Sequence, residues 1–122
     1  MELQFLDFDL SEDADGSVVF DALASVPAAQ LARLHAEVAA VLGWAHETFP
    51  DARAPLEDGG EWDFELDGAI ETRTPQTLHY DERSGEITRE SGTPGPGRFS
   101  VSLSISGSAG FGEALREAFG IA

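Results

Sequence analysis

Residues 61–71, EWDFELDGAIE, decide the fold. Apolar and acidic side chains alternate along this stretch, and successive side chains of a β-strand point to opposite faces of a sheet. The pattern therefore predicts a strand with one buried face and one face in water. The predicted inward residues are Trp62, Phe64, Leu66 and Ile70, and the predicted outward residues are Glu61, Asp63, Glu65, Asp67 and Glu71.

A second alternating stretch, residues 98–106 (RFSVSLSIS), predicts a partner strand. Its serines share one face, and its apolar residues Phe99, Val101, Leu103 and Ile105 share the other. Strands of a parallel sheet are usually apolar on both faces, so two strands with a polar face each favour an antiparallel sheet. We expect Trp62, Phe64, Leu66, Val101, Leu103 and Ile105 to pack against the main helix.

The main helix is predicted over residues 26–49, with Ser25 as its N-cap and Pro50 ending it. Apolar residues recur at helical spacing and form one stripe: Leu31, Leu34, Val38, Val41, Leu42, Ala45 and Phe49. Glu37 falls away from this stripe and is expected in water. A shorter helix is predicted after Ser108, with Phe111, Leu115, Ala118 and Phe119 inward and Gly120 at its end.

The remaining segments complete the element order ββαββββα. Residues 3–10 and 17–24 predict one hairpin, residues 76–81 and 86–90 predict another, and the Gly/Pro-rich residues 91–97 predict a loop. The fold class expected is α+β, a two-layer sandwich in which two helices lie on one face of a mostly antiparallel sheet of about six strands. The 122 residues show no repeat and no linker, so residues 1–122 are expected to form a single domain.

The composition restricts function more than any motif does. Asp and Glu number 23 and Arg numbers 7, which gives a formal net charge of −16. Such a field repels nucleic acids and anionic membrane surfaces, so neither is an expected partner, whereas a basic protein is compatible with it. The chain has no Lys and no Cys, which excludes Schiff-base and Walker-lysine chemistry, disulfides, thiolate nucleophiles and cysteine zinc sites.

No motif supports a metal or a cofactor. The acidic turn at residues 11–16 departs from a calcium loop at Ser11 and Ala22, which occupy the first and twelfth ligand positions. Residues 107–112 run G-x-x-G-x-G rather than in the nucleotide-binding order, and no Lys follows. His35 and His46 are about 16 Å apart along the predicted helix and cannot share an ion. We therefore expect neither cofactor nor metal.

Evidence for catalysis is weak. Asp7 and Asp21 stand between apolar neighbours and would be candidates for acid–base chemistry if their face of the sheet were covered. No nucleophile elbow is present. An enzymatic function is therefore undecided and less favoured. Trp44 lies on the flank of the helical stripe, where either the 50–60 loop covers it or a partner reaches it.

The row Glu61, Asp63, Glu65, Asp67 and Glu71 is the candidate binding site. Carboxylates at alternate strand positions repel each other, and a basic partner would relieve that repulsion, although a merely solvated face has the same appearance. We expect a small acidic non-enzymatic protein-interaction domain. The alternative is a small-ligand-binding or enzymatic domain with a pocket between sheet and main helix. A deep pocket containing His35, His46 or Asp21 would favour the alternative.

The sequence has no signal-peptide pattern at Met1–Gln4 and no apolar stretch of membrane-spanning length. A cytoplasmic location is therefore expected. Nothing in the pattern indicates an oligomeric state.

Overall fold

The computed structural model describes residues 1–122 and confirms the predicted α+β class, with six strands in two antiparallel sheets and two α-helices. In chain order the elements are β1 (Asp9–Glu12), β2 (Val18–Val26), α1 (Leu31–Thr48), β3 (Trp62–Arg73), β4 (Gln76–Asp81), β5 (Glu86–Ser91), β6 (Gly95–Gly107) and α2 (Ala109–Phe119). Two short 3-10 turns, Ala28–Gln30 and Leu56–Asp58, precede α1 and β3.

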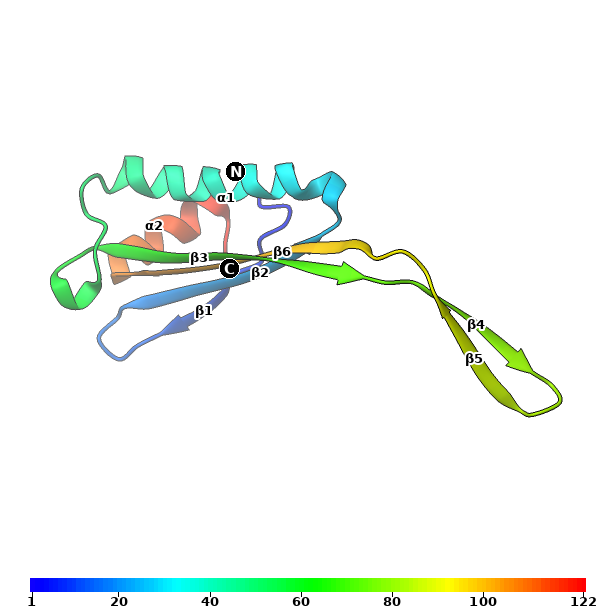
Figure 1. Cartoon of the computed structure of the whole chain (residues 1–122). Coiled ribbons are helices and arrows are strands. Elements are labelled where there is room, and N and C mark those ends of the chain that lie inside the picture. The colour runs from blue at the N-terminus through cyan, green and yellow to red at the C-terminus, as the bar shows by residue number, and fades with distance from the viewer.

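Four strands form the main sheet in the order β1-β2-β6-β3, with every neighbouring pair antiparallel. Both helices lie over the same face of this sheet (Figure 1). Alternate residues of β2 and β6 are buried beneath them, as the period-two patterns predict. The buried side chains are Val18, Phe20, Ala22, Ala24 and Val26 from β2, Val101, Leu103 and Ile105 from β6, Leu34, Val38, Val41 and Ala45 from α1, and Phe111, Leu115 and Phe119 from α2.

An aromatic cluster joins the sheet to both helices. Trp62 is fully buried and stacks on Phe111, with ring centroids 5.6 Å apart and an interplanar angle of 3°. The Trp44 ring of α1 packs against two rings of α2, with centroid distances of 5.9 Å to Phe111 and 5.6 Å to Phe119, so α2 covers it. Of the two alternatives for Trp44, cover by the chain itself is the one observed, and the aromatic side chains that contact it come from α2 and from Phe49 rather than from the 50–60 loop.

The inward face of β3 is buried only at its start. Trp62 is buried and Phe64 is half-buried, as predicted, but Leu66 is 44% and Ile70 66% exposed. These two side chains share the parity of Trp62, yet β3 is the edge strand and the helix layer does not reach over it there. Leu66 and Ile70 therefore lie on the same face of β3 as Trp62, as predicted, but the prediction that they are buried is wrong.

The N-terminal segment packs inside the helix layer rather than in the sheet. Leu6 and Phe8 are buried, but the first strand begins only at Asp9, so the strand predicted over residues 3–10 is mostly absent. Glu37 of α1 is 6% exposed, and its carboxylate accepts hydrogen bonds from the backbone N–H groups of Gln4, Phe5 and Leu6. The prediction that Glu37 lies in water is wrong, because this carboxylate takes the place of a strand partner.

The helix ends follow the predicted chemistry at α2 but not at α1. Ser108 caps α2 by accepting a hydrogen bond from the Phe111 N–H at 3.2 Å, and Gly120 ends it with φ of 64°. The main helix begins at Leu31 instead of residue 26, because β2 continues to Val26. Ser25 is not its cap: the Ser25 Oγ accepts a hydrogen bond from Arg98 Nε at 2.8 Å.

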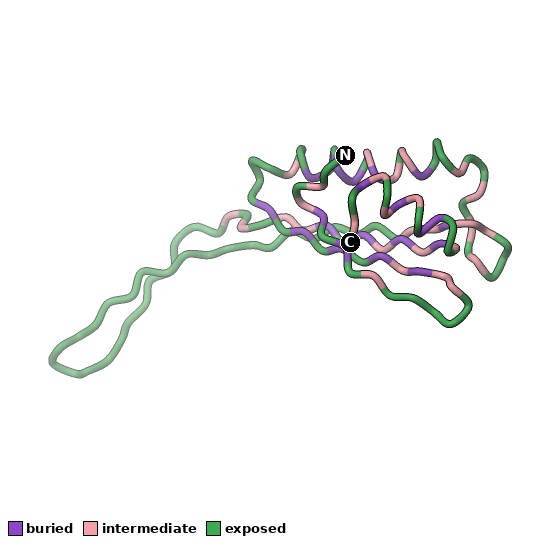
Figure 2. Tube along the Cα trace, turned by 180° about the vertical axis from the view of Figure 1, so that it is seen from behind, coloured by how far each residue is buried: buried purple, intermediate pink, exposed green.

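The predicted hairpin of residues 76–81 and 86–90 is present as β4 and β5, which form a separate two-stranded sheet. This arm, residues 76–91, projects away from the body as an extension of β3 and β6 (Figure 1). Every residue in it is exposed, as the unbroken green of that segment shows (Figure 2). The predicted 91–97 loop is shorter than expected, because β6 begins at Gly95, which pairs with Arg73.

No helix of the protein is both long and apolar enough to cross a membrane.

Candidate functional site

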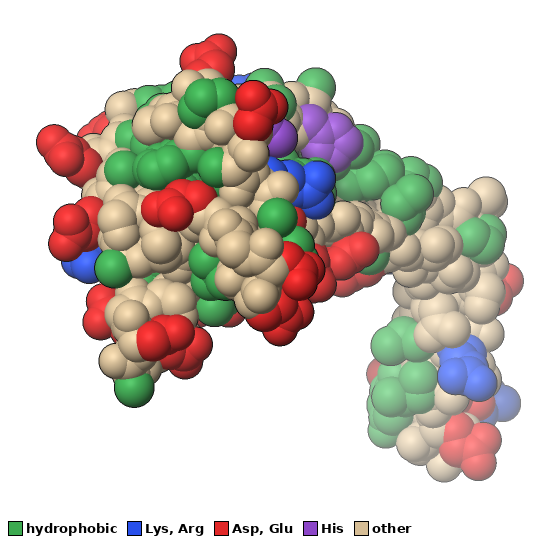
Figure 3. Space-filling view, turned by 90° about the vertical axis from the view of Figure 1, so that its left-hand side faces the viewer, with side chains coloured by type: hydrophobic (Ala, Val, Ile, Leu, Met, Phe, Trp, Pro, Cys, Tyr) green, Lys and Arg blue, Asp and Glu red, His purple; other side chains and the backbone are tan.

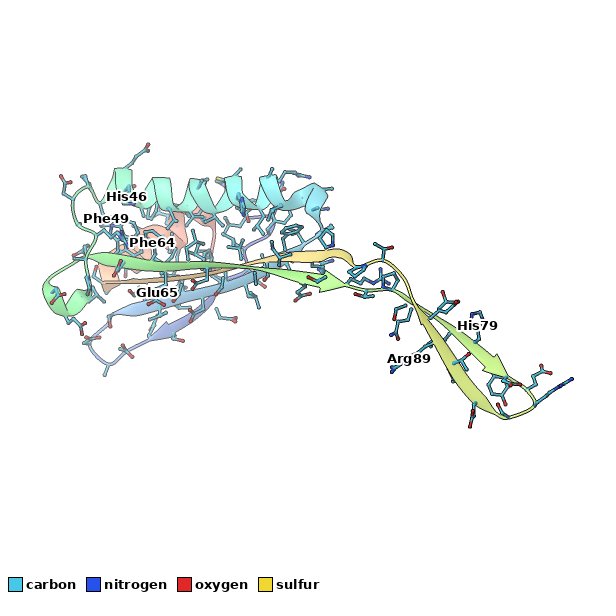
Figure 4. All side chains as sticks on the ribbon, in the orientation of Figure 1. His46, Phe49, Phe64, Glu65, His79 and Arg89 are labelled. Atoms are coloured by element: carbon cyan, nitrogen blue, oxygen red, sulfur yellow. The ribbon has the colours of Figure 1, made fainter.

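The face of the main sheet that points away from the helices has no covering element. Antiparallel register places Asp9, Asp21, Ser104 and Glu65 in one row across β1, β2, β6 and β3. The next row holds Leu23, Ser102 and Asp67. Glu65 extends from β3 on the side away from α1 (Figure 4). We call this surface the outer acidic face; it consists of Asp9, Asp21, Glu65, Asp67 and Glu71, the serines at 100, 102, 104 and 106, and Leu23.

The carboxylates of this face lie close together, and none of them forms an ion pair. Neighbouring strands are about 4.8 Å apart, so Asp21 and Glu65 stand roughly 10 Å apart on either side of Ser104. Asp9 and Asp21 are directly opposite each other on β1 and β2. The ion pairs of the protein involve none of the face's five carboxylates, and all five residues are exposed. The face therefore holds concentrated, uncompensated negative charge.

Two of the predicted site residues are bound elsewhere in the chain. Glu61 is half-buried, and its Oε1 accepts a hydrogen bond from Ser108 Oγ at 2.6 Å. Asp63 pairs with Arg53, with 2.9 Å between Oδ1 and Nε, and the Arg53 guanidinium also lies over the Phe64 ring. Of the predicted row, Glu65, Asp67 and Glu71 keep free carboxylates.

The structure adds three residues that the predicted row did not include. Asp9 and Asp21 join the face through the β1–β2 pairing. Val18, Phe20 and Ala22 alternate with Asp21 along β2 and point inward, so the sequence alone could have placed Asp21 on the outer face. Leu23 is 73% exposed on the same face, two residues from Asp21 and opposite Ser102. An exposed leucine beside carboxylates supplies an apolar contact within a polar surface.

The end of the face nearest the arm carries one arginine. Arg98 of β6 lies opposite Glu71 in register. Its guanidinium is directed across to β2, where Nε donates to Ser25 Oγ at 2.8 Å and Nη2 donates to the Ser25 carbonyl. Arg98 therefore limits the acidic surface at this end.

A groove of about 380 Å³ lies between α1 and the edge strand, where the alternative function requires a pocket. His35, Val38, Ala39 and Leu42 of α1 form one wall, and Leu66, Asp67, Gly68 and Val101 form the other. Of His35, His46 and Asp21, the residues that would favour a ligand pocket, only His35 lines this groove. The His46 ring packs edge-on against Trp62, with ring centroids 4.9 Å apart, and Asp21 lies on the opposite face of the sheet.

The other sequence candidates show no reactive arrangement. Asp7 and Asp21 are both exposed, so neither has the covered environment that acid–base chemistry would require. In the acidic turn, Asp15 accepts hydrogen bonds from the hydroxyl and the N–H of Ser17, and these hold the pKa of Asp15 below its usual 3.8. No three His, Asp or Glu side chains converge on a point where a metal ion could bind.

No family model matches this chain, and no curated protein or solved structure matches it.

Proposed function

We propose that this protein is a small acidic, non-enzymatic protein-interaction domain whose outer acidic face binds a basic partner. One observation carries the proposal: one face of the main sheet is uncovered, and exposed carboxylates that form no ion pair share it with an exposed leucine. In the proposed complex Leu23 is the apolar contact, and Asp21, Glu65 and Asp67 are the charged residues around it.

The charge of the face selects the partner. Like charges directly opposite on adjacent strands destabilise a sheet, so the Asp9–Asp21 pair costs the isolated protein stability. Lysine or arginine side chains of a partner would remove that repulsion and would be attracted from a distance by the net charge of −16. The same field repels phosphate backbones, so the proposed partner is a protein and not a nucleic acid or an anionic membrane.

Small-ligand binding is the second candidate, because the groove beside His35 falls within the volume range of ligand pockets. Its only titratable lining groups are His35 and Asp67, and no nucleophile accompanies them. Binding without catalysis is the most this lining supports. A cytoplasmic location remains part of the proposal, and imaging of the tagged full chain would test it.

Affinity capture from a lysate of the source cell, at 0.1 M and 1 M salt, tests the proposed function. The informative variant is Asp21→Thr/Glu65→Thr, which removes two face charges without touching the groove or the Arg53–Asp63 pair. The matched control is Glu82→Thr/Glu86→Thr, which makes the same charge change on the arm. We expect wild type and control to retain basic proteins at low salt and lose them at high salt, where the Debye length falls from about 10 Å to about 3 Å.

The face variant should lose those proteins at both salt concentrations, and it should also melt slightly above wild type because the Asp9–Asp21 repulsion is gone. If the face variant captures the same salt-sensitive proteins as the control, the outer acidic face is only a solvated surface.

A further inference from the structure

The arm has an apolar face that nothing in the chain covers. Pairing of β4 with β5 places Leu78, Tyr80 and Ile87 on one side, and their exposed fractions are 63%, 66% and 66%. Hydrophobic side chains gather along this side of the arm, next to a basic one (Figure 3). An isolated two-stranded hairpin is marginally stable in water, so an arm of this length and composition needs a surface to pack against.

The charges of the arm are sorted between its two faces. Arg89 is the only charged residue on the apolar face, opposite Leu78. Asp81, Glu86 and Glu90 share the other face with His79, whose Nε2 lies 3.6 Å from Glu90. Arg89 and His79 extend to opposite sides of the arm (Figure 4). The apolar face is therefore positively charged, in a chain that is otherwise strongly acidic.

The groove between α1 and β3 is the complementary surface. Its lining is apolar except for His35 and Asp67. Asp67 has the outward parity of β3, so its carboxylate belongs to the outer acidic face and the groove itself is an apolar surface. The exposed side chains of Leu66 and Ile70 lie along the same edge. Arm and groove are thus two uncovered apolar surfaces of similar length.

The edge strand also offers free backbone groups beside the groove. The carbonyl of Trp62 points away from β6, since it accepts the N–H of Ala54 from the preceding loop. Backbone direction alternates along a strand, so Leu66, Gly68 and Ile70 also present their N–H and C=O groups outward, where no strand pairs with them. The free stretch from Phe64 to Ile70 and the strand β4 are both roughly 20 Å long.

The arm cannot reach the groove of its own chain. It leaves the body at Arg73, the far end of the same edge strand, and projects away from it (Figure 1). Only Thr74 and Pro75 connect β3 to β4, and a hydrogen bond from the Gly92 N–H to the Pro75 carbonyl, 2.8 Å long, closes the junction. Because this connection is short and closed by a hydrogen bond, the arm cannot fold back along β3 of its own chain.

We propose that the occupant of the groove is the arm of a second copy of this chain, giving a two-fold dimer in which each arm lies along the β3 edge of the other protomer. Each chain has one arm and one groove, so a two-fold axis satisfies both at once and closes the assembly. The pairing extends each sheet by strand addition and covers Leu78, Tyr80 and Ile87. It leaves the outer acidic face open, so it does not depend on the proposed function.

Sedimentation or light scattering of the full chain tests the dimer. We expect twice the chain mass of 13.0 kDa at ~100 µM, a concentration at which a complex with a dissociation constant of ~1 µM is almost wholly associated. Leu78→Ser/Ile87→Ser should raise the dissociation constant at least ~100-fold, since four buried side chains are lost per dimer. The control, Thr77→Ser/Thr88→Ser on the polar face of the arm, should stay dimeric.

Far-UV circular dichroism and the fluorescence of Trp44 and Trp62 in the body show whether each variant is folded. Substitutions on the groove side supply a second measurement: Leu66→Ser/Ile70→Ser, at two exposed side chains along the same edge, should also weaken the dimer. A monomer at ~100 µM, a dimer indifferent to Leu78→Ser/Ile87→Ser, or a dimer indifferent to Leu66→Ser/Ile70→Ser would each overturn the proposal, as would a groove that binds a strand of another protein instead.

Discussion

Glu37 is the one charged residue in the core, and it organises the N-terminus. Its carboxylate accepts three backbone N–H groups, from Gln4 at 2.5 Å and from Phe5 and Leu6 at 2.8 Å each. Hydrogen bonds to a charged acceptor are stronger than neutral ones, and their loss would leave buried donors unpaired. We predict that Glu37→Ala lowers the free energy of unfolding by about 3 kcal/mol, measured by urea denaturation.

Glu47→Ala is the matched control, because Glu47 is exposed on the same helix and makes no side-chain hydrogen bond or ion pair; its effect should stay within about 0.5 kcal/mol. Equal effects of the two substitutions would show that the N-terminal segment is not held by Glu37. Sequence periodicity could not identify this role, since the partners are backbone groups more than 30 residues away.

The acidic turn before β2 has a pH dependence of its own. The Ser17 hydroxyl, and then the Ser17 N–H, lower the pKa of Asp15 from 3.8 by hydrogen bonding to its carboxylate. A lowered pKa in the folded state means that this contribution to stability is present above pH 3.8 and is lost as the pH falls through the lowered value. In an NMR titration, Ser17→Ala should move the pKa of Asp15 part of the way back to 3.8; an unchanged pKa would contradict the assignment.

Among the elements, the two helices should respond oppositely to the same substitution. A Cβ on Gly112 of α2 would lie 2.6 Å from Val18 Cγ2, whereas a Cβ on Gly43 of α1 meets nothing within 4 Å. Gly112→Ala must displace the buried Val18 side chain or α2 itself and should destabilise by about 2 kcal/mol. Gly43→Ala should stabilise by about 1 kcal/mol through helix propensity alone. Thermal melts should therefore show a lower melting temperature for Gly112→Ala and a higher one for Gly43→Ala. A Gly112→Ala variant that melts above wild type would contradict the packing of α2 on β2.

Most elements were predictable because their patterns are local. The alternation of residues 61–71 and 98–106, the helical stripe of α1 and the Ser108–Gly120 ends of α2 each depend on neighbours in the chain. Parity, however, says which way a side chain points and not whether anything covers it. Leu66 and Ile70 therefore have the predicted direction and still lie exposed, because cover depends on where α1 crosses the sheet.

For the whole molecule, the arm should be separable from the body. Arg73 and Gly95 are paired across the β3–β6 ladder, so replacing residues 74–94 by a two-residue Asn-Gly turn would close an ordinary hairpin. We predict that this deletion leaves the body folded, with native near-UV circular dichroism from its two tryptophans, and makes the protein monomeric. An unfolded deletion variant would show that the arm contributes to the body's core.

The candidate site was predictable only in part, for a similar reason. The carboxylates of β3 are visible in sequence, but Arg53 and Ser108 engage Asp63 and Glu61 from other elements. Asp9 and Asp21 join the face only through the register of β1 with β2 and of β2 with β6. Cross-strand neighbours are set by strand order, which the sequence pattern does not contain.

The most direct test of the outer acidic face is an NMR footprint. The ¹⁵N-labelled chain would be titrated with the most abundant salt-sensitive protein that it captures, and amide shifts would be mapped on the structure. We expect shifts concentrated at Leu23, Ser102, Ser104 and Glu65, which lie side by side on β2, β6 and β3. Shifts confined to α1, α2 or the arm, with these four amides unchanged, would contradict it.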